Sequence, residues 1–235
     1  MRDMDDNSFW VAFELIARLD PVLISIVLLS LQISLSAVAL ATLTALPLGA
    51  AIALWQFPGR GVVIVILNAF MGLPPVVAGL MVYLLLSRAG PLGQLGLLFT
   101  PPAMVIAQLV LVLPIIAALT RQVIEDLWQE YREQLQSLGV TRLRAIPTLL
   151  WDARLSLLTV VLAGLGRASA EVGAVLIVGG NIDGVTRVMT TAIALETNKG
   201  NLPLALGLGM ILLLLVALLN TGAFIIGETA RKRLG

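Results

Sequence analysis

Arg167 and Glu171 lie four residues apart in a strongly apolar stretch, residues 155–178, that contains no other charge. Residues at this spacing share one face of a helix, where an arginine and a glutamate can partly neutralise one another. A lone charge at the centre of a membrane costs at least about 2.5–3.5 kcal/mol, so such charges usually have a role. Two interpretations stay open: a structural ion pair that fixes helix packing, or a pair that lines or gates a path.

The other residue types exclude most enzyme chemistry. The chain has no His and no Cys, which removes soft metal ligands, disulfides, a Cys nucleophile and a Ser-His-Asp relay. A phosphate-binding loop, G-x-x-x-x-G-K-[ST], is also missing, because Val185 follows the Gly179–Gly184 pair where a lysine is required. The net charge of +1 gives no reason to expect a nucleic-acid partner. We therefore expect no enzyme, no ATPase site and no metal or cofactor in this chain.

The elements that must position these residues are membrane helices. Of the 235 residues, 59% are hydrophobic and 12% charged, and the mean hydropathy is +1.00. A spanning helix needs about 20 mostly apolar residues. Five stretches meet this test and predict an all-α membrane protein with five spans, a sixth being left open: Pro21–Trp55 as one long or tilted helix, Gly61–Ser87, Pro102–Thr120, Arg154–Val178 and Pro203–Gly227.

Two features interrupt the apolar pattern. Pro74 and Pro75 remove two backbone donors in the middle of the second stretch, so the helix must kink or break there. Broken spans line cavities in transporters, and a static kink is the alternative. The segment from Gly179 to Asn201 has an apolar centre of eight residues, too short to span. We expect either a re-entrant or interfacial piece that faces a partner, or a covering loop.

The distribution of Lys and Arg predicts the orientation. The connections on the side of the 121–154 segment carry nine of these residues and those on the other side carry five, which places the 121–154 side in the cytoplasm. The predicted organisation is an external lead-in at 1–20, either an interfacial helix or a simple approach to the first span, a transmembrane domain at 21–227 with a cytoplasmic segment at 121–153, and a basic cytoplasmic tail at 228–235. The N-terminus is then outside, and its acidic residues are not typical of a secretory signal.

The cytoplasmic segment has a helical pattern of its own. Five bases and five acids lie between Arg121 and Arg154, and apolar residues recur at spacings of three and four up to Leu138. Gly139 follows the last of them, as a glycine at the C′ position of a helix would. We predict a helix–turn–helix on the cytoplasmic membrane face, and a solvated loop is the alternative.

Within this segment, Glu133–Gly139 (EQLQSLG) resembles the E-A-A-x-x-x-G motif of ABC-importer permease subunits. Glu133 and Gly139 match the motif at the family's spacing, while Gln134 and Leu135 replace its two alanines. The family's I-x-L-P ending is replaced by residues 149–152, which contain no proline.

Four further stretches resemble the same family in the same order along the chain. Residues 72–79 (GLPPVVAG) are similar to the L-P-P-V-V-x-G stretch of molybdate, tungstate and sulfate permeases, and residues 166–174 (GRASAEVGA) are similar to their G-R-x-x-x-E-x-G-A stretch. Residues 177–182 (IVGGNI) and 190–197 (TTAIALET) look most like the tungstate-specific permeases. The resemblance extends from about residue 21 to the C-terminus.

The resemblance implies a type I ABC-importer-like permease fold and a homodimer in a prokaryotic inner membrane. Two separate ATP-binding subunits would hold ATP and Mg²⁺, and an extracytoplasmic oxyanion-binding protein would deliver the substrate. Tungstate is the first expectation, and molybdate, sulfate or phosphate are alternatives. A stand-alone channel, a secondary carrier or a non-transporting scaffold also remain open.

Candidate site residues come from the resemblance for the coupling, and from the intramembrane charges and the proline break for the path. The coupling to the ATPase would involve Glu133, Ser137, Leu138 and Gly139. The translocation path would involve Arg167, Glu171, Pro74 and Pro75, with Arg167 offering a cationic face to an oxyanion and Glu171 limiting how tightly it is held.

Overall fold

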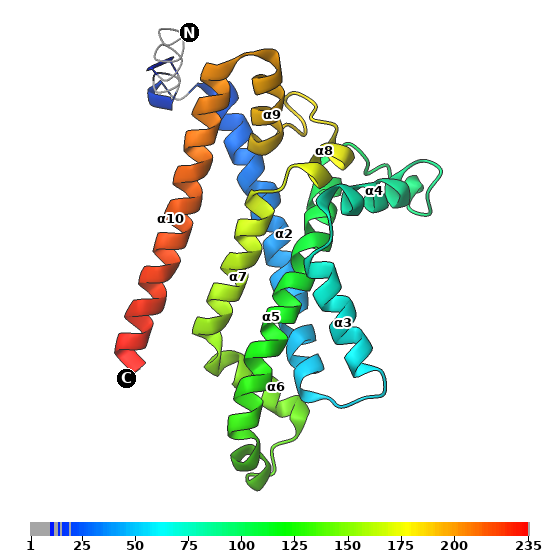
Figure 1. Cartoon of the computed structure of the whole chain (residues 1–235), viewed down its shortest axis with the longest axis vertical. Coiled ribbons are helices and arrows are strands. Elements are labelled where there is room, and N and C mark those ends of the chain that lie inside the picture. Colours follow the sequence, from blue (N-terminus) through cyan, green and yellow to red (C-terminus); the bar gives the residue numbers. More distant parts are fainter. Residues whose placement is uncertain (1–9, 12–13, 15, 19, 235) are drawn as a thin grey trace. The chain divides into compact units, whose positions relative to one another are not determined.

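The regular elements of the chain are all helical in the part that the structure describes. The computed structural model describes residues 10–11, 14, 16–18 and 20–234. In chain order, the helices are α2 (Pro21–Leu54), α3 (Arg60–Met71), α4 (Pro75–Leu86), η1 (Gly93–Leu95), α5 (Pro101–Ser137), α6 (Arg142–Asp152), α7 (Arg154–Ser169), α8 (Gly173–Gly179), α9 (Met189–Lys199) and α10 (Leu202–Leu234) (Figure 1). This confirms the predicted all-α class. Most of the predicted N-terminal lead-in lies outside the described residues.

Three described helices are long and apolar enough to cross a membrane by their length and composition. They are α2, α5 and the Leu202–Gly222 part of α10. Two broken pairs, α3 with α4 and α6 with α7, raise the number to five if each pair counts as one span. The five predicted spans equal the upper end of this range.

Helix α2 begins at a side-chain cap. The Asp20 carboxylate accepts hydrogen bonds from the backbone N–H groups of Val22 at 2.9 Å and Leu23 at 3.2 Å, so two free donors of the first turn are satisfied. The helix then continues for 34 residues. At 1.5 Å per residue this is about 50 Å, well beyond the ~30 Å of a hydrocarbon core. The prediction of one long helix over this stretch is confirmed.

The cytoplasmic segment differs from the prediction at its start. Residues 121–137 do not form a separate helix, because α5 continues from the apolar stretch into the charged one without interruption. No Gly or Pro stands between Thr120 and Ser137 to end the helix. The helix on the N-terminal side of the predicted helix–turn–helix is therefore the end of a span, and only α6 is a separate element.

The fourth predicted span is also interrupted. Helix α7 ends at Ser169 after 16 residues, and α8 begins at Gly173. We call residues 170–172 the α7–α8 break. Glu171 lies in this break, so the expectation that Arg167 and Glu171 share one face of a single helix is wrong. The local cause is described with the site below.

The chain divides into two compact units, each with its own core. The first contains Met1–Ser36, Pro74–Gln108 and Ser169–Leu219, and the second contains Ala37–Leu73, Leu109–Ala168 and Asn220–Gly235. A buried cluster of the first unit joins α2, α9 and α10 through residues such as Leu23, Met189 and Leu208. A buried cluster of the second joins α2, α5, α6 and α7 through residues such as Ala50 and Ile124.

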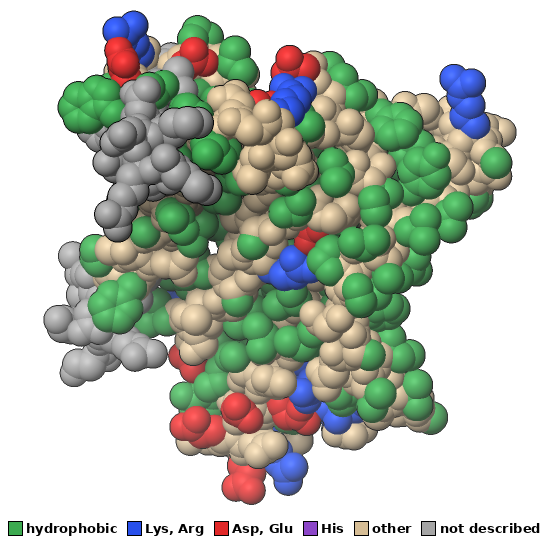
Figure 2. Space-filling model, turned by 45° about the horizontal axis from the view of Figure 1, so that its top comes forward, with side chains coloured by type: hydrophobic (Ala, Val, Ile, Leu, Met, Phe, Trp, Pro, Cys, Tyr) green, Lys and Arg blue, Asp and Glu red, His purple; other side chains and the backbone are tan. Residues whose placement is uncertain are grey.

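Large hydrophobic side chains are also exposed in both units. They are frequent on α3, α4 and α10, and hydrophobic side chains cover much of the face of the molecule shown in Figure 2. Exposed apolar surface of this extent is unusual for a soluble monomer. Because helices satisfy their own backbone hydrogen bonds, such surfaces are compatible with a lipid environment.

Candidate functional site

The turn between α5 and α6 has the geometry of a Schellman motif. Gly139 has a φ of 70°, in the left-handed region that favours glycine. Its N–H donates to the Gln136 carbonyl at 3.0 Å, and the Val140 N–H donates to the Leu135 carbonyl at 2.9 Å. Val140 and Leu135 both pack against the buried cluster of the second unit. This is the pattern of a helix that ends at a C′ glycine, so the predicted role of Gly139 in the turn is confirmed.

Helix α6 is amphipathic and buries one face. Ala145 and Leu149, four residues apart, are buried against Ile124 of α5 and Leu157 of α7. The Tyr131 hydroxyl of α5 lies near the Asp152 carboxylate at the other end of α6. The packing of this buried face fixes α6 on the second unit.

The outer side of the turn is left exposed. We call residues 137–144 the docking surface, because all of them except Val140 are exposed. Its apolar members are Leu138, which is 77% exposed, and Leu143, which is 65% exposed. Ser137 and Gly139 belong to this surface, and Glu133 is exposed one turn earlier on α5. The four residues predicted for coupling therefore lie together at one end of α5.

An ion-pair network lies in the same unit and was not predicted. Glu125 of α5 accepts hydrogen bonds from two arginines, from Nη2 of Arg60 at 2.8 Å and from Nη1 of Arg121. The Nε of Arg60 also donates to the Ile52 carbonyl near the end of α2 at 2.9 Å. Arg60 thereby ties the first turn of α3 to α2 and α5. The Arg121–Glu125 pair has the readable i,i+4 spacing, but the contact of Arg60 spans 65 positions and leaves no sequence signal.

Pro74 and Pro75 lie at a helix break, one of the two outcomes, kink or break, that the sequence left open. Helix α3 ends at Met71, and Pro75 is the first residue of α4, a position that suits its fixed φ and missing N–H. The Pro74 carbonyl accepts from the N–H groups of Val77 and Ala78. The two prolines thus start α4 and do not merely distort a longer helix.

Helices α4 and α8 pack closely in the first unit, where Figure 1 shows them side by side. A Cβ on Gly79 would lie 2.7 Å from the Ala174 Cα, and one on Gly173 would lie 3.0 Å from a Val76 methyl. Only glycine permits this separation of the two backbones. Small residues of the predicted motifs therefore serve helix packing.

Glu171 is buried and takes part in two hydrogen bonds that stabilise the start of α8 and its link to α9. Its side chain is 2% exposed, and its carboxylate accepts a hydrogen bond from the Ala174 N–H at 2.8 Å, in the first turn of α8. An acid in this place satisfies a free donor and interacts favourably with the helix dipole, which explains why a new helix starts here. The Glu171 carbonyl accepts from the Thr190 hydroxyl at 2.7 Å. Arg167 lies in the last turn of α7 and is half-buried.

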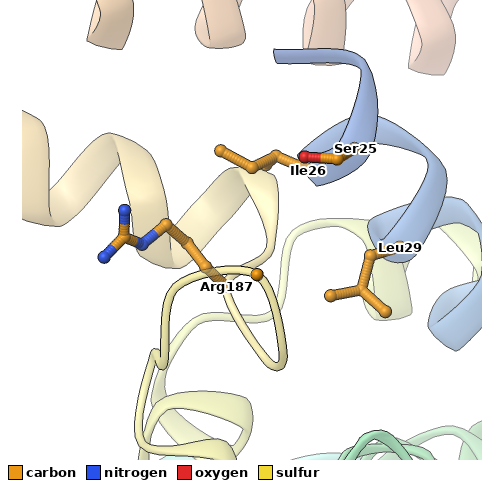
Figure 3. Close-up of a pocket in the computed structure, with 5 residues that line it drawn as sticks. Ser25, Ile26, Leu29 and Arg187 are labelled. Carbon is orange, nitrogen blue, oxygen red and sulfur yellow. The ribbon is translucent and has the colours of Figure 1, made fainter. Parts of the chain in front are cut away.

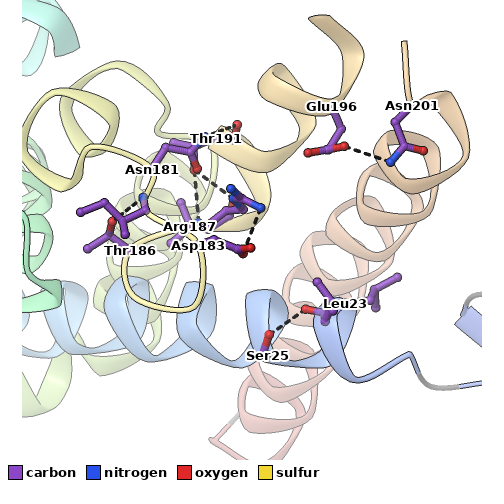
Figure 4. A network of polar contacts seen from close by, with 12 residues as sticks. Leu23, Ser25, Asn181, Asp183, Thr186, Arg187, Thr191, Glu196 and Asn201 are labelled. Carbon is purple, nitrogen blue, oxygen red and sulfur yellow. Dashed lines mark hydrogen bonds and ion pairs between the residues drawn. The ribbon is translucent and has the colours of Figure 1, made fainter. Parts of the chain in front are cut away.

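The segment between α8 and α10 is ordered by polar contacts (Figure 4). The Thr186 hydroxyl accepts from the Ile182 N–H at 2.9 Å and donates to the Gly179 carbonyl at 2.6 Å, which closes the loop before α9. Arg187 pairs with Asp183 at 3.0 Å. Hydrogen bonds from Lys199 and Asn201 to the Glu196 carboxylate hold the pKa of Glu196 below its ordinary value. Within this segment the structure has an 11-residue helix, α9, and its contact with a partner stays a prediction.

A small cavity of about 100 Å³ lies beside this loop. Ser25, Ile26 and Leu29 of α2 line it together with Gly184 and Arg187 (Figure 3). The Arg187 guanidinium is directed away from Ser25 and Leu29 in this view and pairs with Asp183. The cavity has a mixed lining, with Ser25 and Arg187 beside Ile26 and Leu29.

The matching family model decides which class of protein this geometry belongs to. Residues 45–234, most of the chain, match the model described as "Binding-protein-dependent transport system inner membrane component". The chain belongs to this family of ABC permeases.

Several characterised or named permeases are similar over most of their length. A probable anion ABC transporter permease protein of Haloferax volcanii is 42% identical over 203 residues, which cover 84% of this chain and 88% of the relative. The tungstate uptake system permease protein TupB of Peptoclostridium acidaminophilum is 37% identical over 222 residues, covering 94% and 97%. TupB of Campylobacter jejuni is 39% identical over 166 residues, covering 71% and 70%.

Family membership confirms part of what the motifs predicted. The chain is a multi-pass membrane subunit of an ABC importer. In the described residues, no group of three or more acidic side chains is arranged to hold a metal ion.

Proposed function

We propose that this chain is the membrane-spanning subunit of an ATP-driven importer that moves a tetrahedral oxyanion, with tungstate as the leading substrate. The chain makes and breaks no bond itself. The observation that carries the proposal is the docking surface: a rigid Schellman turn that exposes Leu138 and Leu143 in a chain of the ABC permease family. The names of the TupB relatives support tungstate.

The proposed assembly is a homodimer of this chain with two ABC ATP-binding subunits, which bind ATP and Mg²⁺, and an extracytoplasmic oxyanion-binding protein. In this assembly, the docking surface with Glu133, Ser137, Leu138 and Gly139 contacts the ATPase. Exposed apolar side chains on a fixed turn provide apolar area for docking. Because the turn is already ordered, burying them costs little additional conformational entropy. The docking surface and C-terminus then face the cytoplasm, and the N-terminus and α9 face outward, as the Lys and Arg distribution predicts.

The proposed path involves the two breaks. Pro74 and Pro75 start α4 just after α3 has ended, and Glu171 starts α8 just after α7 has ended. Breaks of this kind supply backbone groups to a path in membrane transporters. Arg167 would offer its charge to the passing oxyanion, and replacement by Gln should then reduce uptake without preventing assembly. Full uptake and intact ATPase coupling in Arg167→Gln would remove this role and leave Arg167 a packing residue.

The docking is tested by site-directed crosslinking, for which the chain is well suited because it contains no cysteine. Single variants Leu138→Cys and Leu143→Cys should crosslink to a co-expressed ATPase subunit with a short bifunctional reagent. Arg88→Cys, an exposed position in the loop after α4, is the matched control and should not react with the ATPase. Absence of crosslinks at both docking positions in an intact complex would contradict the proposal.

The substrate is tested by tungsten and molybdenum uptake in a deletion strain complemented with this chain. Tungsten uptake should be restored, and it should be lost again in Leu138→Asp, which places a charge in the docking contact. Preferential molybdenum or sulfate uptake would assign another oxyanion. Transport that persists without ATP or an ATPase would instead favour a stand-alone channel or carrier.

A further inference from the structure

Thr190 links α9 to the α7–α8 break, and its neighbours fix it in place. The Met189 N–H donates to the Ser30 hydroxyl of α2 at 2.7 Å, and the Val188 N–H donates to the Thr191 hydroxyl at 3.2 Å. Ser30 is itself buried and donates to the Ile26 carbonyl. The first turn of α9 is therefore held on both sides of Thr190, so that its hydroxyl has a defined direction.

The partner of the Thr190 hydroxyl is a backbone group at the break. The hydroxyl donates to the Glu171 carbonyl at 2.7 Å, while the carboxylate of the same residue accepts from Ala174 at 2.8 Å. Glu171 thus bonds α9 through its main-chain carbonyl and starts α8 through its side-chain carboxylate. A displacement of α9 along this hydrogen bond changes the position of the residue that caps α8.

The contact extends from the break to a second helix. Ala174, whose N–H is capped by Glu171, is the residue against which Gly79 of α4 packs without space for a Cβ. Packing this close transmits displacement, because the backbones have no room to move independently. Thr190 therefore contacts Glu171, Glu171 contacts Ala174, and Ala174 contacts Gly79, all within the first unit.

Helix α9 also has a face that is free to meet a partner. Ala194, Thr197, Asn198 and Lys199 are exposed, whereas Thr191, Ala192 and Glu196 are buried. The family is defined by dependence on a binding protein, and in the proposed function that protein docks on the side of α9. The exposed face of α9, where the binding protein would dock, and the Thr190 hydrogen bond to the break therefore lie on the same short helix.

From these contacts we infer that Thr190 is a positioning residue that couples binding-protein docking on α9 to the α7–α8 break and to α4. The inference rests on the proposed function. The hydroxyl contributes by fixing the Glu171 peptide, so the break follows α9 when the binding protein engages. Without the hydroxyl, docking still occurs but the break no longer moves with it.

The test uses the whole transporter, with ATPase subunits and binding protein, in proteoliposomes. Thr190→Val keeps the shape of the side chain and removes the hydrogen bond, and Thr190→Ser keeps the hydroxyl. We expect Thr190→Val to lower the stimulation of ATP hydrolysis and of tungstate uptake by loaded binding protein about two- to tenfold, the range for one net hydrogen bond. Basal ATP hydrolysis and binding-protein affinity should stay at the wild-type level.

The controls separate this role from a purely structural one. Thr190→Ser should restore stimulation. Thr44→Val also removes a threonine hydroxyl that donates to a backbone carbonyl, but within α2 in the second unit, and should leave stimulation unchanged. If Thr190→Val does not assemble, Thr190→Ala removes the same hydroxyl with a smaller side chain. Wild-type stimulation in the Val or Ala variant, or equal losses in Val and Ser, would overturn the inference. A wild-type complex that loaded binding protein does not stimulate would instead overturn the proposed function, before any variant is compared.

Discussion

The α5–α6 turn and the α7–α8 break both end a helix, but they do so by different means. At the first, Gly139 takes a positive φ and the backbone satisfies itself through the Schellman hydrogen bonds. At the second, no residue of the break has a positive φ, and a buried carboxylate and a distant hydroxyl satisfy the backbone. The first turn is encoded in a few consecutive residues. The second depends on residues that the fold must bring together.

The difference suits the two proposed roles. A docking surface must keep its shape while a partner is bound or released, and backbone geometry over an apolar core provides this. A gate must change, and a helix start that depends on side-chain hydrogen bonds can be altered at a cost of about 0.5–1.5 kcal/mol per bond. The following predictions would break or sharpen this contrast, and they are ordered from the largest expected effect.

Ile124→Ala should destabilise the second unit most. Ile124 of α5 is completely buried in the cluster that also contains Ala145 and Leu149 of α6. Loss of three side-chain carbons with a residual cavity costs roughly 2–5 kcal/mol. The measurement is the thermal or denaturant midpoint of the purified chain. Leu143→Ala, on the docking surface, is the control and should weaken ATPase binding with little change in the midpoint.

Gly79→Ala should destabilise the packing of α4 on α8. The new Cβ would lie 2.7 Å from a backbone atom of Ala174, so one helix must shift, at roughly 1–3 kcal/mol. Gly209→Ala in α10 is the control, because nothing lies within 4 Å of that position and alanine favours a helix. A Gly79→Ala protein as stable as wild type would show that the two helices separate easily, against the close transmission inferred above.

Gly139→Ala should cost about 1–2 kcal/mol, because an alanine side chain is strained at a φ of 70°. The reason is local, so the crosslinks of Leu138→Cys and Leu143→Cys should weaken before the rest of the unit unfolds. Gly139→Asn should behave more like wild type, since Asn tolerates the left-handed region. Equal stability of the Ala and Gly proteins would contradict a turn encoded by backbone geometry.

Glu196 should give a small effect that depends on pH. Its pKa is lowered in the folded protein by hydrogen bonds from Lys199 and Asn201, so its contribution is complete above the ordinary value of 4.5. It is lost as the pH falls from that value through the lowered pKa. The thermal midpoint of wild type should therefore fall over this interval more than that of Glu196→Gln. Identical slopes in the two proteins would assign the acid sensitivity to other groups.

Local features of the two helix ends could be predicted from the sequence, and features that depend on distant residues could not. Gly139 could be placed correctly because a C′ glycine after an apolar helix is a local signal. The break at Glu171 could not be placed, since residues 170–172 contain no Gly or Pro to end a helix. Thr190 and Ala174, which bond to Glu171 there, are identified only by contact. The break at Pro74 was readable because proline acts on its own backbone. The bond from Arg60 to Glu125 spans 65 positions and has no periodic signature.

Helix α3 carries a consequence for handling the isolated protein. None of its 12 residues is buried by the rest of the described chain, and the Arg60 contacts to Ile52 and Glu125 hold only its first turn. Beyond that turn, the order of α3 depends on whatever surrounds it. In detergent, its amide hydrogens from residue 64 to residue 71 should exchange faster than those in the buried middle of α5, and a lipid nanodisc should slow that exchange. The rate of amide hydrogen exchange in α3 would then report how closely a preparation reproduces the native lipid environment.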